Sequence, residues 1–173
     1  LGGVGSWAVE ALARSGVSRL TLIDGDEICV SNMNRQIHAT DPTVGMSKVT
    51  VMKERIHSIH SDCEVHAIDR YLSPKNCGEF LTDDMDYVLD AIDSVREKCA
   101  LLAYCRDQAI PCICSGGVGG RIDLTQVEIK DLNRSYGDSL LLKVRKTLRK
   151  EYGFSRNRKK KYNIASIFSP ERP

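Results

Sequence analysis

Residues 1–24 have the sequence LGGVGSWAVEALARSGVSRLTLID, which contains a glycine-rich turn, a helix pattern and a strand pattern in that order. Residues 3–8 fit G-x-G-x-x-G/A, whose glycines permit a tight turn and bring the backbone close to a phosphate at a helix N-terminus. We expect a helix with Ser6 as its N-cap and Gly16 just beyond its end. Asp24 ends the strand, where a carboxylate accepts hydrogen bonds from a ribose. This order favours a nucleotide-binding turn over a packing turn with a surface aspartate.

Helix and strand patterns alternate to about residue 115. Strands predicted over 64–68, 87–89 and 111–115 are separated by helices predicted over 46–59, 74–81 and 95–109, and this alternation is typical of parallel βαβ units. A strand over 122–129 and a basic helix over 140–150 follow. The sequence therefore predicts the α/β class, with a Rossmann-like, mostly parallel sheet and helices on both faces. Because such a glycine turn normally follows a buried strand, we expect the sheet to be missing its first strand.

Composition excludes collagen, low-complexity disordered chains and membrane proteins. The 173 residues hold 25 Lys and Arg against 23 Asp and Glu, with 42% hydrophobic residues, which is ordinary for a globular chain. No apolar run approaches the roughly 18 residues that span a bilayer, so we expect a cytoplasmic protein. Seven cysteines without a CxxC pair fit neither a disulfide framework nor a zinc site, which predicts free thiols.

A loop and a lysine suggest which nucleotide chemistry to expect. Asn32-Met33-Asn34-Arg35-Gln36 follows Asp24, and Lys48 opens the next helix. Transfer of an AMP group develops negative charge on phosphate oxygens, which cations stabilise, whereas hydride transfer has no such need. Taken singly, Arg35 or Lys48 would indicate only a solvated surface, so the prediction rests on these residues together. No Gly-Lys-Ser/Thr follows the glycines, which excludes a P-loop.

Asp90 and Asp93 lie at the end of the strand predicted over 87–89. Ligands of open α/β sheets bind at this edge, and a carboxylate there can hold magnesium against phosphate oxygens. The alternative is that Asp93 or Ser94 caps the helix that begins near Val95. The sequence leaves both roles open.

Taken together, these motifs resemble the adenylating domain shared by ubiquitin-activating enzymes and the thiamine- and molybdopterin-biosynthesis adenylyltransferases. The resemblance covers residues 1 to about 120. It implies that ATP and magnesium are bound, with Arg35, Lys48 and Asp93 as catalytic residues and Asp93 also as the magnesium ligand. The ATP-binding residues that it implies are Gly3, Gly5, Asp24, Asn32, Arg35, Gln36 and Lys48. We accordingly predict an N-terminally truncated ATP-binding adenylation domain over 1–141.

Within that superfamily, residues 35–39, 93–98, 103–105 and 116–125 most resemble the tRNA threonylcarbamoyladenosine dehydratases. The resemblance implies an enzyme that adenylates the threonyl carboxylate of a modified tRNA adenosine and cyclises it, releasing AMP. It also implies a homodimer and a cysteine desulfurase system as a partner. The alternatives are an adenylyltransferase for the Gly-Gly end of a sulfur-carrier protein and an inactive nucleotide-binding fragment. No cysteine follows Cys114, which disfavours a carrier-protein enzyme that needs a late thiol.

Charge is distributed unevenly along the chain. Residues 1–141 carry a net charge of −7, whereas residues 142–173 carry +9 and are predicted to be a basic C-terminal helix and tail of the same domain. This density of Lys and Arg suits contacts with RNA phosphates, although a solvated charge run is the common alternative. The predicted tRNA-binding residues are Arg156, Arg158, Lys159, Lys160 and Lys161. Tyr152, Phe154 and Tyr162 flank the run and are candidates for stacking on bases.

Overall fold

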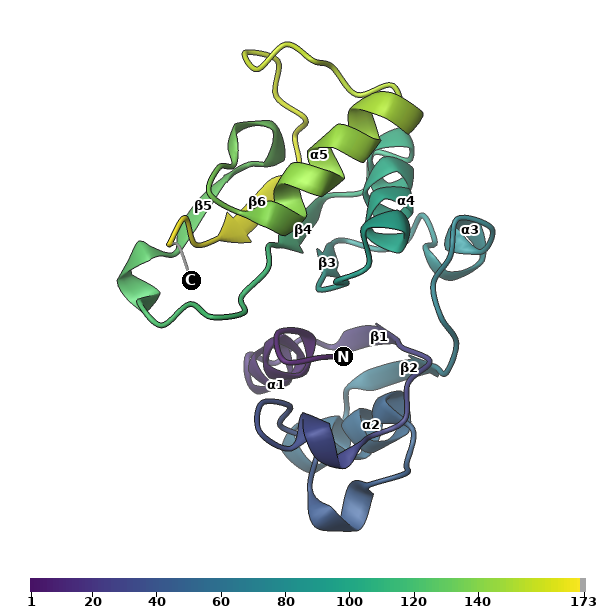
Figure 1. Cartoon of the computed structure of the whole chain (residues 1–173). Helices are drawn as coiled ribbons and strands as arrows, with labels where there is room; N and C mark the ends of the chain where they lie inside the picture. Colours follow the sequence, from purple (N-terminus) through teal and green to yellow (C-terminus); the bar gives the residue numbers. More distant parts are fainter. Residues whose placement is uncertain (172–173) are drawn as a thin grey trace. The chain divides into compact units, whose positions relative to one another are not determined.

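The computed structural model describes residues 1–171, which form two compact units, one over residues 1–72 and one from Ser73 onward (Figure 1). Each unit has its own sheet and its own helices. No helix among the described residues has the length and apolar character needed to cross a lipid bilayer.

The first unit contains two parallel strands and two helices. Its elements are α1 (Gly5–Arg14), β1 (Arg19–Ile23), α2 (Lys48–Ile59) and β2 (Glu64–Ile68). Arg19 lies opposite Glu64 and Ile23 lies opposite Ile68 in the sheet. Two short 3-10 turns, Val30–Asn32 and Asp41–Thr43, lie in the connection between β1 and α2.

The helices of this unit bury one face each, as their sequence spacing predicts. Val49, Met52 and Ile56 recur on one side of α2 and are at most 1% exposed, because a spacing of three and four residues keeps side chains on one helix face. They pack with residues of α1 and both strands. The buried cluster consists of Val9, Ala13, Leu22, Val49, Met52, Ile56, Cys63 and Val65.

The start of α1 differs from the prediction. Ser6 is not the N-cap: it lies inside the first turn, and Val4 precedes the helix with helical backbone angles. The Ser6 N–H donates to the Gly2 carbonyl at 3.0 Å, so the glycines already wind into the helix and no capping side chain is needed. At the other end, Gly16 has φ +78°, which confirms the expected terminating glycine.

The second unit holds a four-stranded, mixed sheet. Its strands β3 (Val88–Asp90), β4 (Cys112–Ser115), β5 (Glu128–Asp131) and β6 (Ala165–Phe168) lie in the order β3-β4-β6-β5. Pairs β3·β4 and β4·β6 are parallel, whereas β5·β6 is antiparallel. The helices are α3 (Cys77–Phe80), α4 (Val95–Asp107) and α5 (Ser139–Glu151). The α/β class and the mostly parallel pairing are confirmed.

Two features of this sheet were not predicted correctly. The strand predicted over 122–129 is wrong for most of its length, because Asp123 instead accepts hydrogen bonds from the Thr125 N–H and hydroxyl and caps a 3-10 turn over Leu124–Gln126. Ile122 is 89% exposed and has no buried face to support a strand. The segment predicted as a tail also contains β6, which lies between β4 and β5.

Helices α4 and α5 lie side by side (Figure 1). The Cys99 thiol of α4 donates to the Val144 carbonyl of α5 at 3.6 Å, and Leu102, Leu141 and Leu148 are wholly buried. All seven cysteines are free and all but Cys29 are buried, which confirms the predicted thiols. Burial raises the pKa of the Cys99 thiol to about 12, so this sulfur is a packing group and not a nucleophile.

Candidate nucleotide site and basic surface

The glycine turn and the loop that follows β1 lie against each other. A Cβ at Gly3 would lie 3.3 Å from both Cγ and Cδ of Arg35, so glycine permits this close approach. The indole Nε1 of Trp7 donates to the Arg35 carbonyl at 3.0 Å. The structure therefore brings together two predicted phosphate contacts, the turn at Gly3 and the side chain of Arg35.

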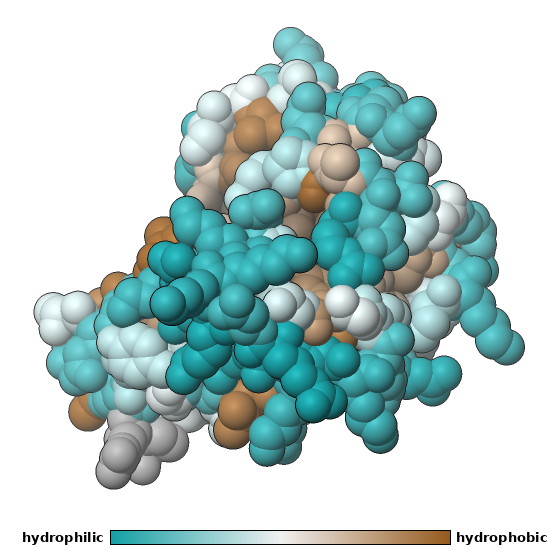
Figure 2. Space-filling view, turned by 90° about the horizontal axis from the view of Figure 1, so that it is seen from above, coloured by the Kyte–Doolittle hydropathy of each residue, from teal (hydrophilic) through white to brown (hydrophobic). Residues whose placement is uncertain are grey.

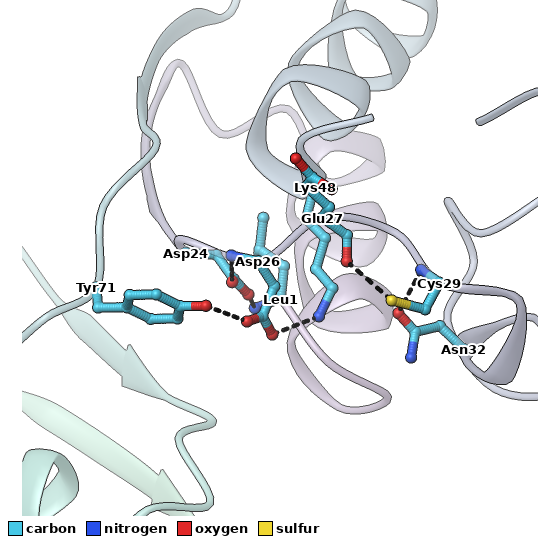
Figure 3. Close-up of polar contacts among 8 residues, drawn as sticks. All are labelled: Leu1, Asp24, Asp26, Glu27, Cys29, Asn32, Lys48 and Tyr71. Atoms are coloured by element: carbon cyan, nitrogen blue, oxygen red, sulfur yellow. Dashed lines mark hydrogen bonds and ion pairs between the residues drawn. The ribbon is translucent and has the colours of Figure 1, made fainter. Parts of the chain in front are cut away.

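Arg35 presents an exposed guanidinium on a fixed stem. Its Nη1 donates to the Ser31 carbonyl and to Oδ1 of Asn34, both at 2.9 Å. Asn32 has a local role, because its Oδ1 accepts the Cys29 N–H at 3.1 Å (Figure 3). Only the amide Nδ2 of Asn32 remains as a donor suited to a phosphate.

Asp24 lies just after β1, at the carboxyl end of the strand, as predicted. Its N–H donates to the Ile68 carbonyl of β2 at 3.3 Å, and its Oδ1 accepts the Asp26 N–H at 2.9 Å. The other oxygen forms an ion pair with the N-terminal ammonium of Leu1 (Figure 3). The carboxylate therefore has the acceptor character that a ribose requires, and its Oδ1 is fixed by the backbone of its own loop.

Lys48 is not part of a solvated surface. It is 5% exposed at the start of α2, and its Nζ lies 2.7 Å from Oδ2 of Asp26. The Tyr71 hydroxyl donates to Oδ1 of the same carboxylate at 2.7 Å, and Figure 3 shows Lys48 and Tyr71 approaching Asp26 from opposite sides. The hydrogen bond from Lys48, followed by that from Tyr71, lowers the pKa of Asp26, so Asp26 holds the ammonium as a carboxylate.

Tyr71 is a residue that the sequence analysis missed. A Cβ at Gly25 would lie 2.9 Å from the Tyr71 backbone nitrogen and 3.0 Å from its ring, so the chain after β2 lies directly on the chain after β1. Glycine between two aspartates is the one local signal of this contact. No pattern in the sequence identifies Tyr71 as the residue on the other side.

Five side chains of the first unit have buried polar atoms without a hydrogen-bond partner among residues 1–171. Two of them are Ser47 and His60, and the other three come from α1 and the loop after β1, namely Ser6 through its Oγ, Gln36 through its Oε1 and His38 through both ring nitrogens. His38 is 2% exposed, and burial, with a smaller contribution from the N-terminal and Lys48 charges, lowers its pKa to about 4. Buried polar groups normally have partners, so these atoms fit a site completed by a polar ligand.

Asp90 and Asp93 have different surroundings in the second unit. Asp90 is wholly buried at the end of β3, and its Oδ2 forms an ion pair with Nζ of Lys98 at 2.8 Å. Lys98 also donates to the Ile92 carbonyl at 2.8 Å, and Asp90 Oδ1 accepts the Ile92 N–H at 2.9 Å. Of the two predicted caps, Ser94 and not Asp93 occupies the N-cap position of α4, where its side chain makes no capping hydrogen bond. Asp93 is exposed.

The structure divides the basic residues of the segment 142–171 into two groups. Arg145 is buried and donates to the Ser135 hydroxyl, and Arg149 binds Tyr162 and Asn133 inside the unit. The exposed group comprises three lysines of α5, Lys143, Lys146 and Lys150, and the five predicted tRNA-binding residues Arg156, Arg158, Lys159, Lys160 and Lys161.

Two of the three flanking aromatic residues do not provide a stacking surface, whereas Tyr152 is half-buried and its stacking stays a prediction. Phe154 and Tyr162 are 5% and 6% exposed and pack edge to face, with centroids 4.8 Å apart. Arg106 lies over the Phe154 ring at 4.0 Å. The suggestion that these two rings stack on bases is therefore wrong, because the protein already covers them.

The residues described hold no group of three or more His, Cys, Asp or Glu side chains that would by itself bind a metal ion. A single carboxylate such as Asp93 still suits magnesium, which usually takes one or two protein carboxylates together with substrate phosphates.

Comparison with known proteins identifies close relatives. The sequence model of the ThiF family matches residues 1–163. The chain is 51% identical over 171 residues to the tRNA threonylcarbamoyladenosine dehydratase of Haemophilus influenzae. This match covers 99% of this chain and 66% of that protein. The Escherichia coli protein of the same name is 47% identical, with 99% and 64% covered. The chain thus spans slightly less than two thirds of these relatives.

Solved structures agree with this comparison. The Escherichia coli tRNA N6-threonylcarbamoyladenosine dehydratase TcdA, solved in complex with ATP, matches with a TM-score of 0.95 and 48% identity, covering 98% of this chain and 70% of that one. The same protein in complex with AMP matches equally well. Escherichia coli MccB with ATP, at 23% identity and a TM-score of 0.63, shares the fold.

Proposed function

Because the chain belongs to the ThiF family, we propose that the full-length protein is an ATP-dependent tRNA threonylcarbamoyladenosine dehydratase. The enzyme adenylates the threonyl carboxylate of the modified adenosine and then closes the side chain into a ring. AMP and pyrophosphate are released. The dehydratases of Haemophilus influenzae and Escherichia coli support this assignment through their identity to this chain.

The observation that carries the proposal is the buried lysine of the first unit. Lys48 Nζ is held by Asp26 just beyond the carboxyl end of β1, the end at which α/β sheets bind ligands. Burial of a lysine is costly unless the charge serves a purpose or is paired. A fixed ammonium at Lys48 and the exposed guanidinium of Arg35 in the same unit are suited to the charge that develops on a polyphosphate.

In the first step, a carboxylate oxygen of the substrate attacks the α-phosphorus of ATP, and the bond from that phosphorus to the bridging oxygen breaks. Pyrophosphate takes the bonding electrons. Lys48 and Arg35 stabilise the charge on the phosphate oxygens, and Gly3 and Gly5 allow the backbone to approach them. Asp24 accepts hydrogen bonds from the ribose.

No bond in this step forms or breaks at Gln36, Asn32 or His38. Gln36 Oε1 lacks a partner within residues 1–171, and we assign it to the nucleotide together with the Nδ2 donor of Asn32. The low pKa of His38 keeps its ring neutral at physiological pH, so this residue adds no charge to the site.

In the second step, an atom of the same modified side chain attacks the activated carboxyl carbon, and AMP leaves. The nucleophile belongs to the substrate, so the enzyme needs no thiol. This agrees with the surroundings of the cysteines on β4. The hydrogen bond with Cys105, followed by burial, raises the pKa of Cys112, and burial raises the pKa of Cys114, both well above that of a free thiol.

Magnesium, the assembly and the location are further parts of the proposal. Asp93 would hold magnesium, which would neutralise phosphate charge, and the support is an exposed carboxylate after β3 that does not cap α4. The family resemblance supports a cytoplasmic homodimer that works with a cysteine desulfurase system. Arg156, Arg158, Lys159, Lys160 and Lys161 are assigned to tRNA binding.

The test measures AMP formation by the full-length protein with ATP, magnesium and tRNA that carries threonylcarbamoyladenosine. We expect AMP only with the modified tRNA, and tighter binding of ATP than of NAD by calorimetry. Arg35→Ala should lower turnover by about a hundredfold or more, as when a charged transition-state contact is lost. AMP formation with unmodified tRNA, or tighter binding of NAD, would contradict the assignment.

A carrier protein ending in Gly-Gly separates the proposal from its main alternative. Pyrophosphate exchange that responds to the carrier and not to the modified tRNA would assign the protein to sulfur-carrier activation. Failure of both acceptors with intact ATP binding would indicate an inactive nucleotide-binding protein.

A further inference from the structure

The segment between α5 and β6 forms a short, highly basic loop. Residues 155–161, here called the basic loop, have the sequence SRNRKKK, with five cations and no acid. All five cations are exposed, and none forms an ion pair with an acid in residues 1–171. The loop stands beyond the end of α5 in Figure 1, and the view from that side in Figure 2 shows a broad hydrophilic surface.

A single buried amide holds the middle of the basic loop. Asn133 is 0% exposed, and its Nδ2 donates to the carbonyls of Asn157 at 2.9 Å and Lys160 at 2.7 Å. Its Oδ1 accepts from Nη2 of Arg149 at 2.8 Å. Both hydrogen-bonding atoms of this side chain are therefore used, and two of its three hydrogen bonds go to the backbone of the loop.

The two ends of the loop are fixed as well. The Tyr162 hydroxyl donates to the Ser155 carbonyl at 2.8 Å and accepts from Nε of Arg149 at 2.9 Å. Asp131 accepts the N–H groups of Tyr162 and Asn163, the second at 2.9 Å. The backbone that carries the charges is thus attached to β5, the turn after it and α5.

This arrangement is unusual for a solvated charge run. Like charges held close together repel one another, and a run without a partner reduces that repulsion by staying mobile. Here the protein uses a buried amide, a carboxylate and a tyrosine to keep the loop in one shape. Preorganisation of this kind lowers the entropy lost on binding, so it favours a polyanionic partner with phosphates at fixed spacing.

We propose that the basic loop is a preformed docking surface for the tRNA sugar-phosphate backbone, and that Asn133 is the positioning residue that keeps it in its binding shape. This inference rests on the proposed function. RNA is favoured over an anionic membrane because the loop has no apolar side chain to insert, and the aromatic residues at its borders are buried. Membrane binding by basic segments gains from such anchors.

The first test compares two charge variants of the full-length protein. One carries Lys159→Ser, Lys160→Ser and Lys161→Ser in the basic loop. The matched control carries Lys143→Ser, Lys146→Ser and Lys150→Ser on α5, which are also exposed and change the charge equally. Titrations with tRNA at several salt concentrations measure affinity and the slope of log K against log salt.

We expect only the loop variant to bind tRNA more weakly, by up to about five- to eightfold for each lost phosphate contact at 0.1 M salt. Its salt slope should become shallower by up to about 0.7–0.9 for each contact. Equal weakening in both variants would overturn the proposal, because charge alone would then explain binding. Stronger binding of the wild-type protein to phosphatidylserine vesicles than to tRNA, lost in the loop variant, would indicate a membrane surface instead.

The second test removes the support and keeps every cation. Asn133→Ala leaves the two loop carbonyls without their donor, and we expect about tenfold or greater loss of tRNA affinity with unchanged ATP affinity. Tyr162→Phe, which loses only the bonds to Ser155 and Arg149, should have a smaller effect in the same direction. Unchanged tRNA affinity and salt slope in a folded Asn133→Ala protein would refute the positioning role.

The outcomes separate this inference from the proposed function. If the protein binds tRNA through the basic loop but forms no AMP, the docking surface is supported and the dehydratase assignment is contradicted. If the wild-type protein forms AMP with modified tRNA and the loop variant has the same KM for tRNA, the dehydratase assignment is supported and the docking surface is contradicted.

Discussion

The buried pair of Lys98 and Asp90 gives a prediction about stability with a definite size. Both side chains are 0% exposed and lie 2.8 Å apart, and Lys98 also binds the Ile92 carbonyl. Removing one partner of a buried ion pair leaves an uncompensated charge and costs about 3–5 kcal/mol. Lys98→Met should therefore lose at least about a fifth of the roughly 5–15 kcal/mol that stabilises a typical domain.

A second variant isolates the charge from the packing. Asp90→Asn combined with Lys98→Met removes both charges and keeps an Oδ1 acceptor for the Ile92 N–H, which is bonded at 2.9 Å. Replacing both members of such a pair is often nearly neutral. We expect the double variant to be more stable than Lys98→Met alone by about 2–3 kcal/mol, as measured by urea denaturation followed by circular dichroism.

The stability of Lys98→Met should depend on pH, and the direction of this dependence follows from the burial of Asp90. Burial raises the pKa of Asp90, and Lys98 works against this shift. Without Lys98 the folded-state pKa rises further, so the folded variant binds a proton that the unfolded chain releases. The free energy of unfolding of Lys98→Met should therefore fall furthest below that of the wild type at neutral pH, and the difference should shrink as the pH falls. A deficit below about 1 kcal/mol, or one independent of pH, would refute this account of the pair.

Four further predictions concern the site and the thiols. Lys48→Ala should lower the rate of AMP formation by about a hundredfold or more, because a fixed charge near the phosphates is lost. Asp93→Asn should raise the magnesium concentration needed for half-maximal turnover, as a magnesium titration would show. The low folded-state pKa of His38, about 4, means that stability is lost as the pH falls from about 6.5 toward 4, and His38→Gln should lose less over this range in acid denaturation. Cys112→Ser with Cys114→Ser should keep turnover, at a cost in urea denaturation of about 1–3 kcal/mol for each buried hydroxyl.

The fold of the first unit was predictable because its signals are local. Strand β2 has the predicted bounds over 64–68, and α2 buries the residues that its spacing selects. Gly16 ends α1 with a positive φ. Periodicity and glycine positions act within a few residues of one another, so a single sequence contains them.

Strand β6 could not be predicted in the same way. Its four residues, Ala165–Phe168, follow a highly charged loop and carry a weak strand pattern. Ile167 pairs with Ser115 of β4 on one side and Ile129 of β5 on the other, and these partners lie far away in sequence. The strand exists because two neighbours supply hydrogen bonds, and this tertiary context overrides local propensity.

The two aspartates after β1 show where prediction of the site reached its limit. Asp24 and Asp26 both follow the first predicted strand, and the sequence assigned a role only to Asp24. The structure separates them, because Lys48 and Tyr71 bind Asp26, whereas Asp24 accepts from the backbone of its own loop. A lysine buried to 5% exposure needs a carboxylate within reach, and Asp26 meets that need. We propose that Asp24 serves the nucleotide, and the different roles of these two identical side chains then follow from which one the lysine contacts.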